Sequence, residues 1–404
     1  MKTLVQKFGG TSVRDQESRH RAIQHIQGAL NEGYQVVVVV SAMGRLGDHY
    51  ATDSLLQLID YPETQMTKRE VDVLMSCGET ISSVVMAHEL QQQGITAASL
   101  TGARAGFLTT NDFTDARINK VDPTDIEKYL KTNDVVVVAG FQGQDEDGNV
   151  TTLGRGGSDT SAVALGGALH SDYVDIFTDV DGIKTADPRL VENARTLQVM
   201  TYNEIVHLAY QGSKVIHPRA VEIAMQEKIP IRVRSTYSQD SGTLVTAKKD
   251  QTVDQGFKDR LVTGIAHVSG ITQIKVYSDD DPVKLHNDVL SQLADAEISV
   301  DFFNISTDGI TFTVPTDSLT QTTSIIENLD YRYQIVEKCA KVSTVGAGIQ
   351  GVPGVASKVV KALSRYDIPI LQSADSHTTI WVLVKEQDLE NAVNALHQVF
   401  LEDR

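Results

Sequence analysis

The sequence predicts an α/β protein in which a three-layer α/β/α sandwich is followed by two ferredoxin-like βαββαβ modules. Three observations lead to this prediction. Short runs of β-branched residues alternate with helical patterns over residues 1–246, as in a parallel sheet covered by helices. The remaining residues contain an internal repeat with a spacing of 70 residues. The 404 residues, 41% of them hydrophobic and 22% charged, suffice to form several packed domains.

Two valine-rich runs define the centre of the predicted parallel sheet. Val36–Val40 and Val135–Val138 are apolar at every position, which is typical of strands buried on both faces. The helical patterns between the strands supply the covering layers. In chain order we expect a strand at 4–8, a helix at 19–30, a strand at 36–40, a helix at 71–90, strands at 135–138 and 174–177, a helix at 219–227 and a strand at 229–234.

The C-terminal repeat is carried by five apolar positions. Leu293, Ile298, Ile310, Phe312 and Val314 recur as Leu363, Ile368, Ile380, Val382 and Val384. Each copy follows the pattern strand, helix, strand, strand, and a terminal helix is expected at 388–400. Two ferredoxin-like modules paired edge to edge satisfy this pattern. Because residues 247–259 are polar and aperiodic, we expect a domain at 1–246, a linker at 247–260, and modules at 261–333 and 334–404.

Charge and composition exclude several classes of function. The net charge of −17 has the wrong sign for a protein that binds nucleic acid or anionic membrane through its general field. The apolar runs are far shorter than the roughly 20 residues of a membrane-spanning helix. The N-terminus lacks a secretory pattern and the two cysteines stand far apart, which favours a cytoplasmic location. No Cys/His pair has zinc spacing, so we expect no structural metal.

A glycine-rich turn follows the first predicted strand directly. Lys7-Phe-Gly-Gly-Thr-Ser-Val13 lies between that strand and a helix, where backbone amides are available to bind anions. The glycines allow the backbone to approach a phosphate, and Lys7 adds a point charge. The turn therefore predicts a phosphate site, the alternative being a structural turn with an exposed lysine. The P-loop motif is absent.

A second anion site is predicted at Gly154-Arg-Gly-Gly-Ser-Asp-Thr-Ser161, ahead of an apolar helix. Ser158 or Asp159 is expected to cap that helix. The guanidinium of Arg155 is suited to bidentate binding of a carboxylate, and Asp159 is too close to a predicted phosphate site to be an ordinary surface charge. The alternative is a capped helix after a tight loop.

Two further segments are candidates for ligand binding. Glycine within a helix costs about 1 kcal/mol relative to alanine, so Gly78 indicates a close approach or a break beside Glu79. Glu79 is a candidate ligand for an ammonium group, or else a solvated helical glutamate. The turn at 177–189 is dense in Asp, Gly and Pro and follows a strand at the edge where such folds bind ligands. It lacks the third ligand and terminal Glu of a calcium loop.

One motif points to a different chemistry. Val345-Gly-Ala-Gly-Ile-Gln-Gly351 matches the dinucleotide fingerprint G-x-G-x-x-G, and Asp367 follows at suitable spacing. Only 53 residues follow Gly351, too few for the remaining strands of a dinucleotide-binding domain. We therefore interpret the motif as a loop that opens a helix through a Pro353-Gly354 turn, which could also seat a small amphiphilic ligand.

Eight motifs, in order and spacing, resemble those of the aspartate kinase family. They are KFGGTSV at 7–13, SAMG at 41–44, GET at 78–80, GFQG at 140–143, TLGRGGSDTSA at 152–162, FTDVDGIKTADPR at 177–189, GSKVIHPRA at 212–220 and IRVRST at 231–236. The C-terminal repeat resembles the paired ACT modules of that family's regulatory domain. The resemblance covers nearly the whole chain and implies an amino-acid-kinase fold.

The resemblance implies transfer of the γ-phosphoryl group of ATP to the side-chain carboxylate of L-aspartate, giving 4-phospho-L-aspartate. This reaction opens lysine, threonine, methionine and diaminopimelate synthesis. Lys7 would neutralise the transferring phosphoryl group and Asp159 would organise Lys7, while Glu79 would bind the α-ammonium group. Arg155 would bind a carboxylate of aspartate. The other implied aspartate contacts are Ser41, Thr52, Gly156, Gly157 and Ser158.

The resemblance also implies an ATP site, with Mg²⁺ held chiefly by phosphates and water rather than by an all-protein cage. Its implied residues are Lys7, Phe8, Gly9, Gly10, Thr178, Asp179, Lys184, Thr185, Ala186, Asp187, Pro188, Arg189 and Lys214. The ACT modules imply feedback control by an end-product amino acid. The implied effector positions are Asn304, Gln372, Ser373 and Thr378.

The identity of the effector is open among meso-diaminopimelate, lysine and threonine. SDDDPVKLH at 278–286 lacks the glycine that follows proline in the second copy, and QSADSHTTIWVLV at 372–384 differs from the lysine-responsive pattern. Unpaired edge strands favour a homodimer through the modules. Two other functions are alternatives. One is a related kinase acting on acetylglutamate, carbamate or a nucleotide, which has no obvious use for two ACT modules. The other is a catalytically silent sensor, which has no need to retain Lys7 and Glu79.

Overall fold

The computed structural model describes residues 2–213, 215–247, 261–278, 281–346, 349 and 352–402. Packing divides the chain into two compact units. Unit 1 consists of Met1–Ile183, Thr196–Ala209 and Lys214–Gln255, and unit 2 of Lys184–Arg195, Tyr210–Ser213 and Gly256–Arg404. Most of the expected linker, and most of the glycine motif at 345–351, lie outside the described residues.

Unit 1 is built on an eight-stranded sheet with the order β10-β12-β11-β9-β1-β2-β6-β3. Its strand pairs are parallel except β11 with β12, so the sheet has the predicted architecture. The strands are β1 (Lys2–Phe8), β2 (Tyr34–Val40), β3 (Ala97–Leu100), β6 (Val135–Ala139), β9 (Tyr173–Thr178), β10 (Val199–Thr201), β11 (Ile231–Ser235) and β12 (Thr243–Thr246).

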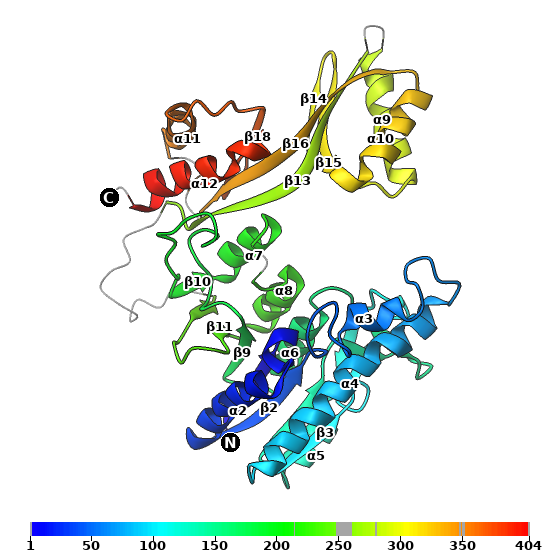
Figure 1. The fold of residues 1–404 in the computed structure, drawn as a ribbon, viewed down its shortest axis with the longest axis vertical. Coiled ribbons are helices and arrows are strands. Elements are labelled where there is room, and N and C mark those ends of the chain that lie inside the picture. The colour runs from blue at the N-terminus through cyan, green and yellow to red at the C-terminus, as the bar shows by residue number, and fades with distance from the viewer. Residues whose placement is uncertain are drawn as a thin grey trace. The chain divides into compact units, whose positions relative to one another are not determined.

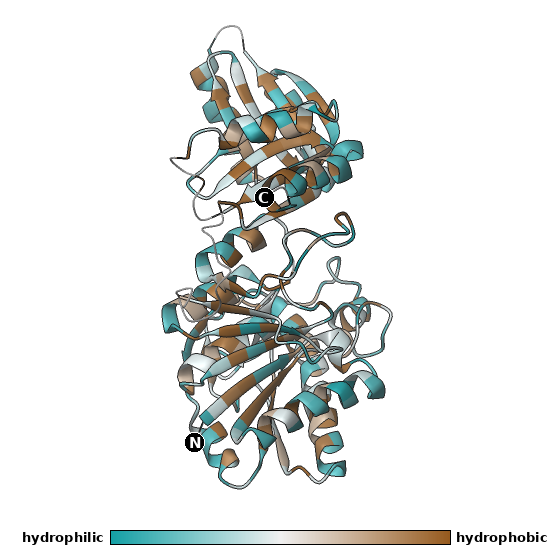
Figure 2. Ribbon diagram, turned by 90° about the vertical axis from the view of Figure 1, so that its left-hand side faces the viewer, coloured by the Kyte–Doolittle hydropathy of each residue, from teal (hydrophilic) through white to brown (hydrophobic). Residues whose placement is uncertain are grey.

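Helices cover both faces of this sheet, which confirms the predicted three layers. On one face α2 (Gln16–Asn31) and α4 (Lys68–Gln92) pack on Val36, Val38 and Val40 of β2, and on the other α6 (Gly157–Ala168) packs on β1 and β9 and on α8 (Pro218–Glu227). Both valine runs are fully buried, and Figure 2 shows the strands of unit 1 carrying long hydrophobic stretches. The shorter helices are α1 (Gly10–Val13), α3 (Thr52–Gln57), α5 (Thr124–Leu130) and α7 (Tyr202–Tyr210).

A small second sheet in unit 1 has the order β5-β4-β7-β8. Its strands are β4 (Phe107–Thr109), β5 (Ile118–Val121), β7 (Gln142–Gln144) and β8 (Val150–Thr152). The hairpin of β7 and β8 leads from the end of β6 to the glycine-rich loop before α6. This sheet therefore determines where that loop begins.

Unit 2 is built on one continuous six-stranded sheet with the order β14-β15-β13-β16-β18-β17. The C-terminal half of β13 and the start of β16 complete the first module, whereas the start of β13 pairs with the end of β16 in the second. Each module thus takes its fourth strand from the first strand of the other, and both have the ferredoxin order. The strands are β13 (Gly264–Tyr277), β14 (Asp301–Ser306), β15 (Gly309–Pro315), β16 (Arg332–Val345), β17 (Gln372–Asp375) and β18 (Thr379–Lys385).

The helices of the two modules lie near opposite ends of the long strands β13 and β16, those of the first module near one end and those of the second near the other, as Figure 1 shows. The first module's core gathers Ile274, Val276 and Phe312 under its helices, and the second's gathers Ile265, Val342 and Val382. The helices are α9 (Pro282–Asp295) and α10 (Leu319–Asn328) in the first module and α11 (Val355–Ser364) and α12 (Leu389–His397) in the second, with 3-10 turns at Thr316–Ser318 and Glu386–Asp388 and a π-helical turn at Gln398–Glu402.

Two local features differ from the sequence predictions. The sequence QIKVYS at 273–278 predicts the first strand of the first module, but this strand begins at Gly264; the alternating pattern before residue 273 is interrupted by an irregular register near Gly270, which has φ 70°. The expected cap of α6 by Ser158 or Asp159 is wrong. The N-cap is Gly156 in the left-handed conformation, and both side chains lie buried in the first helical turn.

The fully buried valine run offers a test of the core. Val38→Ala removes two methyl groups from a strand covered on both faces, so we expect the free energy of unfolding to fall by about 2 kcal/mol in urea titrations. Val73→Ala, at a side chain that is 44% exposed on α4, should change it by less than about 0.5 kcal/mol. Equal losses in the two variants would contradict the assigned layers.

Candidate active site

Three neighbouring parallel strands, β9, β1 and β2, end along the same edge of the large sheet. Phe8 pairs with Val40 on one side and with Phe177 on the other, so the loops after all three strands begin side by side. The Nζ atom of Lys7 lies 2.6 Å from Oδ1 of Asp159 in the first turn of α6, and both side chains are about one-eighth exposed. This edge is where parallel α/β sheets bind ligands.

The loop after β1 is held against the loop after β2. The amide of Ser41 donates to the carbonyl oxygen of Phe8, and that of Gly44 donates to the carbonyl oxygen of Gly10. A Cβ atom at Gly10 would lie 2.6 Å from the Gly44 oxygen and 2.9 Å from the Ala42 oxygen, so only glycine fits. Gly9 and Gly10 are half-buried; a Cβ atom at Gly9 would lie 3.5 Å from Nζ of Lys7, and the Gly9 amide donates a long hydrogen bond of 3.4 Å to the carbonyl oxygen of Phe177.

Glu79 lies in the middle of α4 with its carboxylate buried beneath the same loops. Its Oε1 accepts a hydrogen bond of 3.0 Å from the amide of Ala42, while its Oε2 is buried without a hydrogen-bond partner. Burial raises the pKa of Glu79 from 4.5 to about 8, because desolvation outweighs the hydrogen bond from Ala42. A buried carboxylate with an unused oxygen is suited to receive a cationic group from a ligand.

Gly78 is the close approach that the sequence indicated, and α4 continues through it without a break. A Cβ atom there would lie 2.8 Å from the Cβ of Ala42 and 3.0 Å from the carbonyl oxygen of Tyr50. Because Gly78 has no side chain, α4 packs closely against Ala42, which follows Ser41, and against Tyr50, two residues before α3 begins at Thr52. These contacts bring the predicted aspartate contacts Ser41, Thr52 and Glu79 together.

The glycine-rich loop before α6 carries Arg155 exposed at its tip and Gly156 in the left-handed conformation with φ 69°. Gly157 and Ser158 are buried in the first turn of α6. A Cβ atom at Gly140, directly after β6, would lie 3.0 Å from the Cβ of Ser158. The predicted carboxylate-binding loop therefore lies at the sheet edge with its guanidinium exposed.

Three residues that the sequence predictions did not assign hold this loop in place. Asp72 of α4 is fully buried and accepts hydrogen bonds of 2.8 Å and 2.6 Å from the amide and hydroxyl of Thr152, where the loop begins. Burial raises the pKa of Asp72. Arg219 of α8 donates to the carbonyl oxygen of Leu153, and a Cβ at Gly156 would lie 2.2 Å from the ring of His217.

Sequence signals for these residues were present. His217 and Arg219 belong to the GSKVIHPRA motif, and Asp72 is a charged residue within an apolar helical stretch. Neither signal identifies a partner, because the partners are backbone groups of a distant loop.

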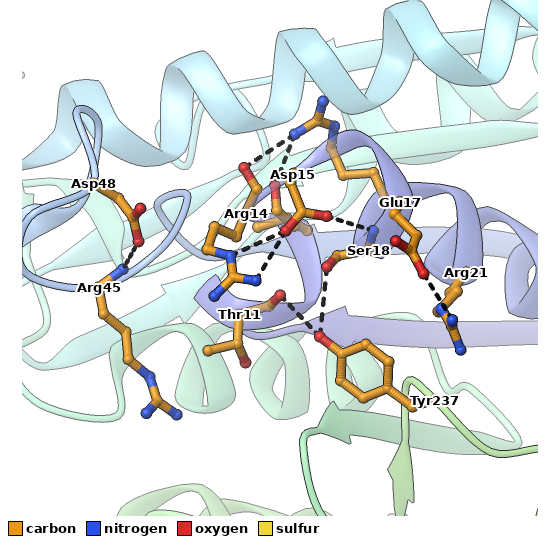
Figure 3. Close-up of polar contacts among 11 residues, drawn as sticks. Thr11, Arg14, Asp15, Glu17, Ser18, Arg21, Arg45, Asp48 and Tyr237 are labelled. Carbon is orange, nitrogen blue, oxygen red and sulfur yellow. Dashed lines mark hydrogen bonds and ion pairs between the residues drawn. The ribbon is translucent and has the colours of Figure 1, made fainter.

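Thr178 and Asp179 follow β9 at the same edge of the sheet. The hydroxyl of Thr178 donates to Oδ1 of Asp179 at 3.1 Å, and Arg45 from the loop after β2 forms an exposed ion pair of 2.9 Å with Oδ2. Figure 3 shows the Arg45 side chain extending from a turn closed by Asp48. Arg45 is a further cation that the sequence predictions did not assign.

Figure 3 also shows how the first loop is fixed on its other side. Asp15 caps α2 by accepting from the amide of Ser18, and the hydroxyl of Tyr237, which follows β11, donates to the carbonyl oxygen of Thr11 at 3.3 Å. The residue that directly follows the IRVRST motif, Tyr237, therefore contacts the loop that follows Lys7.

The structure does not bring all predicted ATP-binding residues into unit 1. Lys184 to Arg189 pack in unit 2, where Asp187 and Arg189 form an ion pair of 2.6 Å that holds the pKa of Asp187 below its usual value. Lys214 lies outside the described residues. The positions predicted for ATP within unit 1 are Lys7, Phe8, Gly9, Gly10, Thr178 and Asp179.

The predicted effector residues lie on or beside the two edge strands of unit 2. Gln372 of β17 accepts a 2.8 Å hydrogen bond from Gln273 and donates to the carbonyl oxygen of Phe302 of β14, so the two edge strands meet near these residues. Asn304 and Ser373 are exposed nearby on β14 and β17, and Thr378 lies in the turn before β18.

Comparison with known proteins agrees with this architecture. Residues 2–235 match the amino acid kinase family, and residues 334–398 match the ACT domain. The chain is 58% identical over 400 residues to Aspartokinase 1 of Bacillus subtilis (strain 168), covering 99% of both chains, and 39% identical to an aspartokinase of Geobacillus stearothermophilus, covering 99% and 97%.

Two solved structures of E. coli aspartokinase III, one with aspartate and ADP in the R-state and one with lysine and aspartate in the T-state, each give a TM-score of 0.78 at 26% identity. Each alignment covers 99% of this chain and 100% of the other.

The mainly parallel sheet, with Lys7 and its glycine loop at one edge, defines an amino acid kinase. Within that family the chain belongs to the aspartokinases. The predicted fold class, an amino-acid-kinase fold followed by ACT modules, is confirmed. No helix in the described part of the chain is long and apolar enough to span a membrane.

The raised pKa of Glu79 predicts how stability depends on pH. Between pH 4.5 and about 8 the unfolded state ionises this group while the folded state keeps it protonated, so folding loses free energy as the pH rises. Glu79→Gln removes that loss, and its stability advantage over the wild type should grow by on the order of 1 kcal/mol per pH unit across this window and level off above it. Urea unfolding from pH 5 to 9 measures the difference, and a constant difference would contradict the assignment.

Proposed function

We propose that this chain transfers the γ-phosphoryl group of ATP to the side-chain carboxylate of L-aspartate, giving 4-phospho-L-aspartate and ADP. The observation that carries the proposal is the pairing of Lys7 with Asp159 at the sheet edge, next to the buried unpartnered oxygen of Glu79. The first feature suits a phosphoryl group and the second suits an amino acid. The aspartokinase relatives, and the E. coli structure titled as a complex with aspartate and ADP, support the same reaction.

The chemistry requires positioning and charge compensation. The nucleophile is a carboxylate that is already ionised near neutral pH, so no general base is needed. Its oxygen attacks the γ-phosphorus, the bond from that phosphorus to the bridging oxygen breaks, and ADP leaves with the electron pair. Because both reactants are anions, the site must lower their repulsion and stabilise the charge of the transition state. Lys7 and the amides of Gly9 and Gly10 supply that positive potential.

Recognition of aspartate follows from the two ends of the molecule. The carboxylate of Glu79, ionised when a cation replaces its missing solvation, binds the α-ammonium group. The exposed Arg155 binds a carboxylate through two parallel hydrogen bonds. Ser41, Thr52 and Ser158, with the glycines of the Arg155 loop, complete the hydrogen bonds and fix the length of the amino acid that fits.

ATP binds with its phosphates at the Lys7 loop and with further contacts from Thr178 and Asp179. Lys184 to Arg189 and Lys214 remain candidate ATP contacts on the family resemblance alone. Among the described residues no group of three or more His, Cys, Asp or Glu side chains is arranged to hold a metal ion. On the family resemblance, a Mg²⁺ ion that accompanies ATP would take its ligands chiefly from phosphate oxygens and water, and it would neutralise phosphate charge.

Unit 2 binds a regulatory amino acid near the meeting point of β14 and β17. Polar groups of Asn304, Gln372, Ser373 and Thr378 are available there, and Gln372 already links the two modules. The T-state structure of the E. coli relative is titled as a lysine complex, which supports an amino-acid effector. Kinase rates measured against increasing lysine, threonine and meso-diaminopimelate would distinguish the three candidates.

A homodimer through unit 2 follows from the edge of the six-stranded sheet. Edge strands leave backbone groups available for pairing, and Phe303 and Ile305 on β14 are 57% and 51% exposed. Large apolar side chains on an open edge are typical of surfaces that become covered in an assembly.

The reaction is tested by ATP- and Mg²⁺-dependent formation of aspartyl hydroxamate, in which hydroxylamine traps the acyl phosphate. We expect activity in the wild type and a loss of at least about a hundredfold in kcat for Lys7→Ala, because a cation at the developing charge is removed. Lys2→Ala, at an exposed lysine on the same strand, should retain activity. A folded wild type that binds an amino acid but makes no hydroxamate would support the silent sensor instead.

Sedimentation velocity at micromolar concentration tests the dimer. The wild type should sediment as a dimer, and the double variant Phe303→Asp/Ile305→Asp should sediment as a monomer, because charges on an apolar edge oppose its burial. Leu58→Asp, at a 74% exposed side chain of unit 1, is the control and should stay dimeric. A monomeric wild type would refute the assembly.

A further inference from the structure

His397, the last residue of α12, is completely buried within unit 2. Its Nε2 lies 2.8 Å from the hydroxyl of Thr185, and its Nδ1 lies 2.8 Å from Oε1 of Glu402 in the π-helical turn that follows α12. A continuous chain of hydrogen bonds therefore connects the C-terminal turn to Thr185. Thr185 belongs to the FTDVDGIKTADPR motif, 212 positions earlier in the sequence.

The contacts fit one neutral tautomer of His397. The hydroxyl oxygen of Thr185 accepts from the amide of Arg195 at 3.0 Å and also faces Nε2 of His397, where either atom can be the donor. Because a carboxylate only accepts, Glu402 favours the tautomer with the proton on Nδ1, which leaves Nε2 to accept from Thr185. Thr185 is only 1% exposed, so the arrangement does not present its hydroxyl to a substrate.

Further contacts hold the same segment in the second ACT module. The amide of Ile265 at the start of β13 donates to the carbonyl oxygen of Thr185, and Asn394 of α12 donates to that of Leu190 at 2.7 Å. Arg195 donates to the carbonyl oxygen of Leu401. Ala186 and Val191 belong to the hydrophobic core under α11 and α12. The segment 184–195 is thus part of the regulatory unit although it lies in sequence between β9 and β10, two strands of the large sheet of unit 1.

A second segment is held in the same way at an independent place. Gln211 accepts hydrogen bonds from the indole nitrogen of Trp381 at 2.7 Å and from the hydroxyl of Ser343 at 3.0 Å, both on the sheet of the second module. Gln211 stands three positions before Lys214 in the sequence. The family resemblance assigns two further stretches to ATP, Lys184–Arg189 and Lys214. Thr185 within the first, and Gln211 shortly before the second in sequence, are both anchored in unit 2.

We propose that His397 and Glu402 are positioning residues for ATP: by holding Thr185, they fix the segment Lys184–Arg189 in the conformation that contacts the nucleotide. This rests on the proposed function, which assigns that segment to ATP. The residues proposed to bind aspartate belong to unit 1, whereas Thr185, His397 and Glu402 belong to unit 2. Loosening the hydrogen-bond chain therefore weakens ATP binding while leaving aspartate binding unchanged.

The test compares kinetic constants for both substrates in the full-length enzyme. His397→Leu removes the acceptor for Thr185, and we expect the KM for ATP to rise about tenfold, as for the loss of one buried hydrogen bond, with kcat and the KM for aspartate within about twofold of the wild type. His397→Gln keeps an acceptor and a donor and should restore most of the affinity. Glu402→Ala, at a side chain that is one-third exposed, should give a smaller rise in the KM for ATP.

His286→Leu is the matched control. This histidine also lies in unit 2 and makes a single hydrogen bond, to the carbonyl oxygen of Gly309, away from the segment 184–195. It should leave both KM values unchanged. Should His397→Leu fail to fold, as judged by circular dichroism, Glu402→Ala decides the question alone.

The outcomes separate the two proposals. A wild type without hydroxamate formation contradicts the proposed function. An active wild type whose folded His397 or Glu402 variants keep the KM for ATP, or raise both KM values equally, contradicts the positioning role while leaving the kinase intact. A selective rise in the KM for ATP, reversed by His397→Gln and absent in His286→Leu, supports it.

Discussion

The ion pair between Lys7 and Asp159 is the interaction on which the proposed kinase site depends. It joins the last residues of β1 to the first turn of α6 at 2.6 Å, with both side chains largely shielded from water. Shielding strengthens the attraction, and it keeps the lysine from adopting other rotamers. The buried strands β2 and β9, which pair with β1 on either side, hold this geometry in place. Their register with β1 fixes where the loops after the three strands begin. A kinase that must join two anions needs its positive charge fixed in this manner before the substrates arrive.

The buried carboxylate of Glu79 in the same region lowers the stability of the fold when it is ionised, and in the proposed function substrate binding would offset this loss. Glu79 has an unpartnered oxygen below the surface, and such a group opposes folding once it is ionised. In the proposed function an α-ammonium group supplies the missing partner, so selectivity for an amino acid and destabilisation of the empty site would have one cause. Asp72 has the same degree of burial but is saturated by Thr114 and Thr152, which is typical of a structural carboxylate. The two residues stand on one helix and differ in function through their partners.

Much of this was predictable from the sequence, and the reasons are local. The valine runs and the glycine turns are patterns within a few residues, so they predict strands and loops directly. The repeat is visible because the same apolar positions recur 70 residues later, so it predicts two modules. The roles of His217, Arg219 and Asp72 were not predictable, because each contacts backbone or glycine from a different part of the chain. The exchange of fourth strands between the ACT modules was also hidden, since the irregular register near Gly270 interrupts the alternating pattern of β13, so the part that pairs with the second module was not recognised as the same strand. The capping prediction for α6 failed because Asp159 pairs with Lys7 instead of capping the helix.

Two segments that lie in sequence between elements of unit 1 pack in unit 2, since Thr185 and Gln211 are anchored there by hydrogen bonds. In the proposed kinase site Asp159 acts by holding the charge of Lys7. A double-mutant cycle on kcat, with Lys7→Ala, Asp159→Asn and the double variant assayed at saturating ATP and aspartate, measures this coupling. We expect Asp159→Asn to lower kcat in the wild type but to have little further effect once Lys7 is absent. Losses that multiply in the double variant would contradict it and give Asp159 a role independent of Lys7.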